Sequence, residues 1–201
     1  RDTSVTGVQT CALPILIGLV VVVVIIAVLG FIAIGSYNRL VALNQKADQS
    51  FADIDVQLKQ RNDLIPNLVE TVKGYANHER VALEAVISAR SASLAEETTA
   101  HEQAAADGVL SGALRQLFAL SEAYPDLKAN ASFVSLQEEL SNTESRIAYA
   151  RQFYGDSVAS YNTAIQKFPN VVVARMFGFT AREFFEAEPA AANAPSVNFG
   201  S

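Results

Sequence analysis

The feature that most constrains this chain is an uninterrupted apolar run close to its amino terminus. Residues 15 to 34 read ILIGLVVVVVIIAVLGFIAI and contain neither a charged nor a strongly polar side chain. A helix of this length covers about 30 Å, the thickness of the hydrocarbon core of a bilayer. Its many β-branched residues favour strands in water, but a single strand in lipid would leave its backbone unpaired. We therefore expect a transmembrane helix over residues 15–35, with residues 15–34 contacting the lipid bilayer.

The alternative to a retained anchor is a cleaved signal peptide. Ala33, Ile34 and Gly35 resemble a cleavage site with small residues at its two key positions. The apolar core of a secretory signal usually has about 7 to 15 residues, however, and this run is longer. The length favours an anchor, and Tyr37 and Arg39 follow it as an aromatic ring and a cation suited to the membrane interface.

The residues before the run are expected to be foreign to the fold. The segment VTGVQTCALPI, residues 5 to 15, resembles a translated sequencing adapter, so residues 1–14 are set aside as a non-native segment. Cys11 is the only cysteine and there is no tryptophan. A disulfide framework or a thiolate metal site is therefore not expected.

The charged residues of the chain indicate on which side of the membrane its body lies and which partners it can bind. The basic residues Arg39, Lys46, Lys59 and Arg61 follow the run, which favours a cytoplasmic body for a single-pass protein under the positive-inside rule. The chain carries 15 basic and 21 acidic residues, a formal charge of −6. Nucleic-acid surfaces need clustered lysine and arginine, so no nucleic-acid partner is expected.

Helical periodicity dominates the chain after the run. Apolar or small residues recur three and four positions apart from residue 37 to residue 76, which predicts a helix with one face against partner helices. Pro66 lies inside this pattern. Proline lacks an amide proton and clashes with the carbonyl four residues back, so we expect a restart or a sharp kink there, capped by Asn62 or Asp63.

Further helices are predicted over residues 79–94 and from residue 110 to a stop at Tyr124 and Pro125, separated by a polar, alanine-rich connection over residues 95–108. The longest pattern runs from residue 133 to residue 168 and ends at Pro169. No alternating strand pattern appears, so the fold class is all-α, with long antiparallel helices.

The end of the chain is expected to hold a short helix and a tail. Thr180 and Glu183 have the spacing of a capping box, which predicts a last short helix carrying Phe184 and Phe185. Residues 189–201 are rich in alanine, proline and asparagine and are expected to be disordered.

Residues with catalytic or metal-binding potential are few. His78 and His101 lack a second ligand at helical spacing, and no Glu-x-x-His or HEXXH motif occurs. Asp53 and Asp55 face different sides of a helix and cannot act as a close acid and base pair. We therefore expect no catalytic residue, no metal site, no cofactor and no enzymatic activity.

Long stretches of the chain resemble the bacterial LemA family of membrane-anchored helical proteins. They include DIDVQLKQRNDLIPNLVETVKGYANHE, EAYPDLKANASFVSLQEEL, TESRIAYARQFYGDSVASYNTAIQKFP and FGFTAREFFEAE. The resemblance implies an antiparallel four-helix bundle over residues 36–188, behind one amino-terminal span in the bacterial cytoplasmic (inner) membrane. The family's biochemical role is unsettled.

The resemblance also places a family signature on this chain, for which we expect interaction or structural roles. Its residues are Asp53, Asp55, Asp63, Leu64, Ile65, Pro66, Asn67, Glu70, Tyr124, Pro125, Leu127, Asn130, Arg146, Arg151, Tyr154, Tyr161 and Asn162.

Three functions compete at this point. The first is a non-enzymatic, membrane-anchored interaction or scaffold protein that binds an unidentified membrane or envelope protein. The second is a structural protein that shapes the membrane or organises the envelope by forming a homo-oligomer through its long helical faces. The third is an enzyme or an accessory subunit of an envelope enzyme, which would require Asp63 or Glu70 to line a pocket beside a group with a perturbed pKa.

Overall fold

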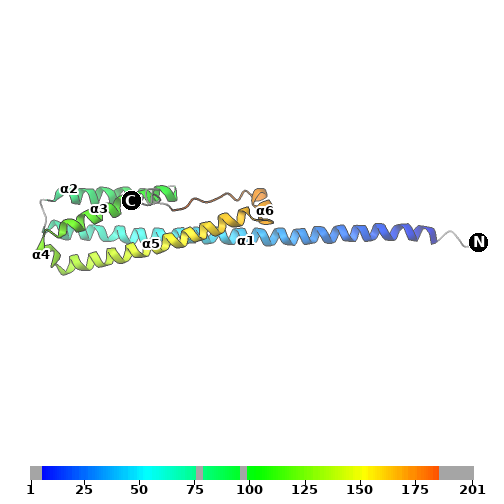
Figure 1. Cartoon of the computed structure of the whole chain (residues 1–201), viewed down its shortest axis with the longest axis horizontal. Coiled ribbons are helices and arrows are strands. Elements are labelled where there is room, and N and C mark those ends of the chain that lie inside the picture. Colours follow the sequence, from blue (N-terminus) through cyan, green and yellow to red (C-terminus); the bar gives the residue numbers. More distant parts are fainter. Residues whose placement is uncertain (1–5, 76–78, 96–98, 186–201) are drawn as a thin grey trace, which may run out of the picture. The chain divides into compact units, whose positions relative to one another are not determined.

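The computed structural model describes residues 6–75, 79–95 and 99–185 (Figure 1). The described residues form helices and no strand, so the all-α prediction is confirmed. The helices are α1 Thr6–Lys73, α2 Arg80–Ser93, α3 Ala100–Ser121, α4 Pro125–Lys128, α5 Ala131–Gln166 and α6 Asn170–Phe177. The predicted bounds of α2 and α5 agree with the observed ones to within two residues. His78 and the predicted tail from residue 189 lie outside the described residues.

The apolar run forms the amino-terminal part of α1. Its large side chains from Leu16 to Ile34 are 45% to 79% exposed, and none of the most apolar window is buried within the chain. Within the described residues, α1 is the helix that is long and apolar enough to cross a membrane. The described part of the chain therefore leaves this surface uncovered.

The chain divides into two compact units. Unit 1 comprises residues 1–45 and 160–181, and unit 2 comprises residues 46–159 and 182–201. The core of unit 1 joins α1, the end of α5 and α6 through Leu40, Tyr161, Ala164, Ile165, Val173 and Ala174. At the end of α6, Gly178 adopts a left-handed conformation with a φ of 74°, which glycine accepts without strain.

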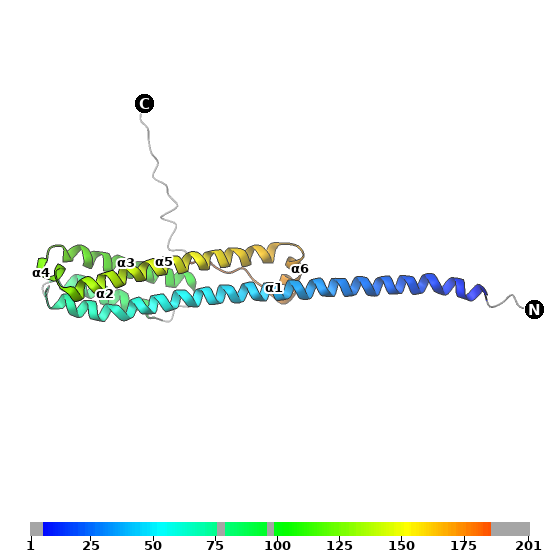
Figure 2. The same ribbon diagram turned by 90° about the horizontal axis from the view of Figure 1, so that it is seen from below.

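Unit 2 has two hydrophobic clusters. One takes buried side chains from α1 through α5, and its members include Ile65, Leu68, Val86, Leu110, Leu127 and Phe133. The other joins α1, α3 and α5 and includes Ala47, Ile54, Ala104, Ile147, Tyr154 and Val158. Figure 2 shows α1 and α5 side by side in this unit. Most described positions predicted from the spacing of threes and fours are thus buried, whereas Tyr37 and Phe168, near the ends of the two patterns, are exposed.

Pro66 does not end or restart a helix, so the predicted restart with a cap at Asn62 or Asp63 is wrong, and the alternative of a kink stays a prediction. α1 continues from Thr6 through Pro66 to Lys73. The proline leaves the carbonyl of Asn62 without its usual helical donor, and Arg90 of α2 replaces that donor, with Nε donating to the Asn62 oxygen at 2.9 Å. Ser93 also donates to the side-chain oxygen of Asn62 at 3.0 Å. Donors from a second helix therefore stabilise α1 at its proline.

The connection predicted over residues 95–108 is mostly helix. α3 begins at Ala100, directly after a capping box in which the Thr99 hydroxyl accepts from the Glu102 amide at 3.2 Å and Glu102 accepts from the Thr99 amide at 3.1 Å. Ala100 and Ala104 are buried in the second cluster. The alanines that suggested a connection allow close packing instead.

The capping box predicted at Thr180 and Glu183 does not open a helix. Residues 178–185 are not helical. In unit 1 the carbonyl of Thr180 accepts from the Tyr161 hydroxyl at 2.9 Å, and in unit 2 the carbonyl of Glu183 accepts from the Tyr154 hydroxyl at 2.9 Å. These two carbonyls are satisfied by tyrosines, and Phe185 is buried in the second cluster.

Candidate functional site

A cluster of charged side chains lies inside unit 2. Asp107 of α3 is 2% exposed and forms ion pairs with Arg61 of α1, which is 1% exposed, and with the half-buried Arg151 of α5. Arg61 also donates from Nη1 to Ser111 Oγ at 2.9 Å and to Glu144 Oε2 at 3.0 Å. One carboxylate thus joins three helices.

The electrostatics of this cluster follow from its burial. Burial lowers the pKa of Arg61, while the charge of Glu144 and its hydrogen bond raise it. Burial, with a smaller contribution from the charge of Arg61, lowers the pKa of Arg151 to about 10. Both guanidinium groups remain protonated at neutral pH. Asp107 therefore lies between two cations that would otherwise repel each other.

The sequence analysis names Arg151 as a signature residue but does not predict its partner Asp107 or the burial of Arg61. Asp107 falls in the connection predicted over residues 95–108. The available signal was local: an arginine at a position where the apolar spacing demands burial needs a buried carboxylate partner.

Signature residues also cap the helices at one end of unit 2. Tyr124 precedes Pro125, the first residue of α4, and its hydroxyl donates to Glu79 Oε1 at 2.9 Å, which raises the pKa of Tyr124. Asn130 accepts from the Phe133 amide at 3.0 Å and donates to the Tyr75 hydroxyl at 2.9 Å. These contacts are structural.

The Asn130 contact predicts a measurable loss of stability. Asn130→Ala is expected to lower the free energy of unfolding by about 1 kcal/mol, because the cap of α5 loses its acceptor. Urea unfolding of the full chain in detergent, followed by circular dichroism, measures this change. Asn142→Ala, at an exposed position within the same helix, is the matched control. Equal losses in the two variants would contradict a capping role.

The signature residues near the proline lie mostly at the surface. Asp63, Asn67 and Glu70 are exposed, and the Asn67 carbonyl accepts from Thr71 Oγ1 at 2.8 Å. Glu70 and Pro66 line a cleft of about 380 Å³ whose other lining residues are Ile65, Val69, Lys73, Ile87 and Arg90. No carboxylate of this group has a second carboxylate or a histidine beside it among the lining residues.

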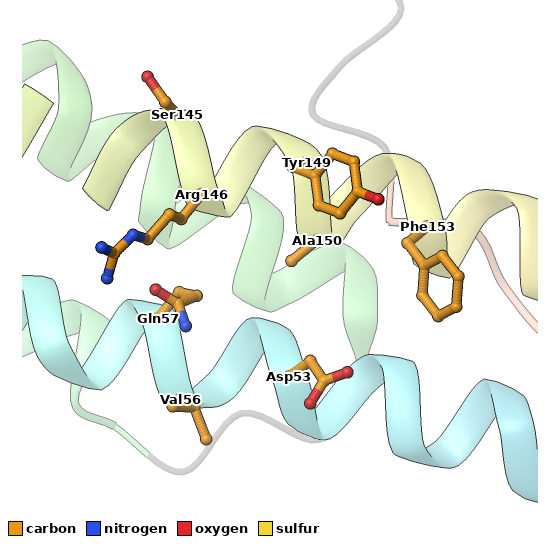
Figure 3. A pocket seen from close by; sticks show the side chains of 8 residues that line it. All are labelled: Asp53, Val56, Gln57, Ser145, Arg146, Tyr149, Ala150 and Phe153. Carbon is orange, nitrogen blue, oxygen red and sulfur yellow. The ribbon is translucent and has the colours of Figure 1, made fainter. Parts of the chain in front are cut away.

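A second cleft lies between α1 and α5 and is shown in Figure 3. It measures about 420 Å³ and is lined by Asp53, Val56, Gln57, Ser145, Arg146, Tyr149, Ala150 and Phe153. Figure 3 shows Arg146 extending from α5 toward Gln57 of α1, with Asp53 farther along α1. We call this opening the α1–α5 cleft.

The signature aspartates occupy different sides of α1. Asp53 lines the α1–α5 cleft, whereas Asp55 accepts from Gln103 Nε2 of α3 at 2.5 Å. The prediction that these aspartates face different sides of the helix agrees with these partners.

The remaining signature residues contribute to packing. Tyr154 and Tyr161 are buried and hold the two carbonyls described above, and Asn162 is half-buried with a partner of its own.

The chemistry of the α1–α5 cleft suits binding. Tyr149 is 73% exposed, Val56 60% and Phe153 41%, so the lining presents apolar surface to solvent. Arg146 and Asp53 add one charge of each sign. The described residues contain no group of three or more histidine, cysteine or acidic side chains placed to hold a metal ion.

The match to known proteins covers the residues that build these sites. The family model described as the LemA family matches residues 50–199. The chain belongs to the LemA family. The matched range includes the charged cluster, both clefts and the signature tyrosines, which confirms the resemblance inferred from the sequence.

Individual relatives of this LemA-family chain are distant. Magnetosome protein MamQ of Magnetospirillum gryphiswaldense is 27% identical over 184 residues, covering 77% of this chain and 66% of the relative. Magnetosome protein MamQ 2 of Paramagnetospirillum magneticum is 25% identical over 196 residues, covering 84% and 72%. Protein LemA of Metamycoplasma hominis is 25% identical over 165 residues, covering 81% and 74%. The chain therefore spans about two thirds to three quarters of these relatives.

Proposed function

We propose that this LemA-family protein is a membrane-anchored, non-enzymatic scaffold that binds a partner protein through the α1–α5 cleft. The observation that carries the proposal is the apolar part of α1, whose side chains from Leu16 to Ile34 are exposed along the whole run. In water such a surface would cost about 25 cal/mol for each Å² left uncovered, whereas lipid covers it without that cost.

The body attached to this anchor is proposed to be an antiparallel four-helix bundle made from α1, α2, α3 and α5. The cluster that joins these four helices in unit 2 supports this arrangement. We propose the bacterial cytoplasmic membrane as its location, with the body on the cytoplasmic side. The basic residues Arg39, Lys46 and Lys59 after the run support that orientation.

A binding role for the body rests on the α1–α5 cleft. Exposed tyrosine and phenylalanine side chains beside an arginine are enriched at protein interfaces. Asp53 is the one carboxylate among the described residues that line this cleft, and no histidine is among them. The cleft thus has the features of a recognition surface and lacks a second acid or base beside Asp53.

The anchor predicts how the protein is extracted from membranes. The full chain is expected to stay with the membrane pellet after alkaline extraction. Val22→Arg combined with Ile25→Arg is expected to release it, because each central arginine costs about 2.5–3.5 kcal/mol of insertion free energy. Immunoblotting of pellet and supernatant measures the distribution. The control, Asn38→Arg with Gln45→Arg, adds the same charge outside the run and should leave the protein in the pellet. Release of the unaltered chain would refute the anchor.

The cleft predicts position-specific crosslinking. A photo-crosslinking amino acid at Tyr149 is expected to give a discrete adduct in cells. Arg146→Glu should abolish that adduct, because it reverses the charge of the cation among the described lining residues. Val81 of α2, which is 82% exposed, is the control position and should not give the same adduct. Immunoblotting of the tagged chain detects the adducts. Identical adducts at both positions, or none at Tyr149, would count against the scaffold proposal.

A further inference from the structure

The outer surface of α6 is apolar and exposed. Val172 and Met176 lie one turn apart on the same side of this helix and are 50% and 74% exposed. Phe168, just before the helix, is 84% exposed. We call these three residues the α6 surface. Phe177 is 61% exposed at the end of the helix and lies one turn after Val173, on the other side of α6. The opposite side of α6 is buried through Asn170, Val173 and Ala174. These buried residues pack the helix, and the apolar outer surface is not needed for that packing.

Contacts within unit 1 place this surface close to the end of the apolar run. The ring of Phe177 lies 4.9 Å from the ring of Tyr37, and Phe179 lies 5.8 Å from it. Tyr37 is three residues beyond Ile34, which is about 4.5 Å along a helix. The headgroup layer on each side of a bilayer is about 5–7 Å thick. With the run in lipid, Tyr37 and Phe177 therefore lie at headgroup depth.

The charge of unit 1 is also suited to a membrane surface. Its described residues, 6–45 and 160–181, contain the exposed cations Arg39, Lys167 and Arg175 and no aspartate or glutamate. The whole chain, in contrast, carries a formal charge of −6. Cations beside apolar side chains favour anionic lipid, because the surface attracts the headgroups while the apolar groups enter the acyl boundary.

We propose that the α6 surface is a second membrane contact, which inserts into the interfacial layer of an anionic bilayer beside the α1 span. The proposal rests on the anchor of the proposed function and adds a new contact to it. The buried core of unit 1 fixes α6 to α1. With α6 at the bilayer surface, the part of α1 that follows the span would keep one orientation to the bilayer, which a single flexible anchor cannot impose. Phe168, Val172 and Met176 supply the inserted side chains, and Lys167 and Arg175 contact the headgroups.

The absence of tryptophan from the chain makes a direct depth measurement available. Met176→Trp gives the full chain one fluorophore on the α6 surface, and Phe168→Trp gives a second, independent position. Each variant is reconstituted in vesicles of phosphatidylcholine and phosphatidylglycerol whose acyl chains are brominated close to the headgroup. Ile26→Trp, inside the apolar run, and Tyr149→Trp, in the α1–α5 cleft, are the comparison positions.

Both α6 variants are expected to lose roughly half or more of their emission to the shallow bromines, and Tyr149→Trp is expected to lose only a small fraction. Quenching at α6 should weaken in vesicles of phosphatidylcholine alone, because the cations then lack anionic partners. Equal quenching in the two kinds of vesicle would overturn the choice of an anionic bilayer.

The remaining outcomes distinguish a failure of the α6 contact from a failure of the anchor. One outcome is that Ile26→Trp is quenched while the α6 variants are quenched no more than Tyr149→Trp. That outcome would overturn the α6 contact and leave the anchor intact. No quenching at Ile26→Trp would remove the anchor, and the α6 contact with it. A last outcome is that the quenching of the α6 variants weakens as the amount of protein in each vesicle is raised. This would show that a second copy covers the α6 surface, which also overturns the proposal.

Discussion

Asp107→Ala is expected to lower the free energy of unfolding by about 3–5 kcal/mol, the cost typical of leaving a buried charge without its partner. Arg61 and Arg151 would then face each other without the carboxylate that pairs with both. Arg61 is 1% exposed, so solvent cannot take the place of Asp107. Urea unfolding of the full chain in detergent, followed by far-ultraviolet circular dichroism, measures the loss.

Two variants make this result specific to charge. Asp107→Asn keeps the shape and removes the charge, so its loss should approach that of the alanine variant. Asp156→Ala removes an exposed carboxylate from α5 and should change the stability by less than about 0.5 kcal/mol. If Asp107→Asn were as stable as the unaltered chain, shape rather than charge pairing would hold the cluster together.

Replacing Asp107 together with both arginines should be far less damaging than removing Asp107 alone, because Glu144, which is 46% exposed, can be hydrated when Arg61 is gone. A combined variant with Arg61→Met, Asp107→Leu and Arg151→Met exchanges paired charges for apolar side chains of similar size. Such exchanges are often neutral or stabilising by about 1–4 kcal/mol. A combined variant less stable than Asp107→Ala would mean that the charges contribute net stability, contrary to this expectation.

Pro66→Ala is expected to raise the free energy of unfolding by up to about 3 kcal/mol, the cost of proline inside a helix. The alanine amide can donate to the Asn62 carbonyl within α1. In the unaltered chain that carbonyl accepts from Arg90 at 2.9 Å. The gain will be smaller than the full helix penalty because Arg90 already offsets part of the loss. Urea unfolding of the full chain again provides the measurement.

The second half of this prediction is a double-mutant cycle. Arg90→Ala alone is expected to cost about 1.5–3 kcal/mol, the range for a hydrogen bond from a charged donor. In the Pro66→Ala background the same change should cost clearly less, because the alanine amide then satisfies Asn62. Arg80→Ala, at an exposed position in α2, should cost the same in both backgrounds. Purely additive effects of Pro66→Ala and Arg90→Ala would show that Arg90 does not compensate for the proline.

The core of unit 2 could be predicted because burial in a helix leaves a local trace. Ile54, Leu58 and Ile65 follow one another at spacings of four and seven residues, and all three are buried. Each position is determined by the 3.6-residue turn of its own helix. α5 could be predicted for the same reason, whereas the apolar run could be predicted from its length and its lack of charged residues.

The charged cluster could not be predicted in this way, because its burial depends on distant partners. Asp107 is separated from Arg61 by 46 residues, and nothing beside Asp107 in the sequence distinguishes it from a solvated acid. The α1–α5 cleft is similar, since Asp53 and Arg146 belong to different helices.

The two capping boxes show how tertiary contacts override a local signal. Thr99 with Glu102 and Thr180 with Glu183 have the same spacing, yet only the first opens a helix. The Thr180 carbonyl, which would accept from Phe184 in a helix, accepts from the Tyr161 hydroxyl instead. A pattern of four residues carries no information about a tyrosine on another helix.

The bond between Arg90 and Asn62 has a consequence for the order of events during translation. α1 leaves the ribosome before α2 is synthesised, so water must hydrate the Asn62 carbonyl in the nascent chain until Arg90 emerges. The turn around Pro66 therefore frays in the growing polypeptide and becomes rigid only once α2 has docked. A proline that looks like a local defect thus makes the end of the first helix depend on the arrival of the second.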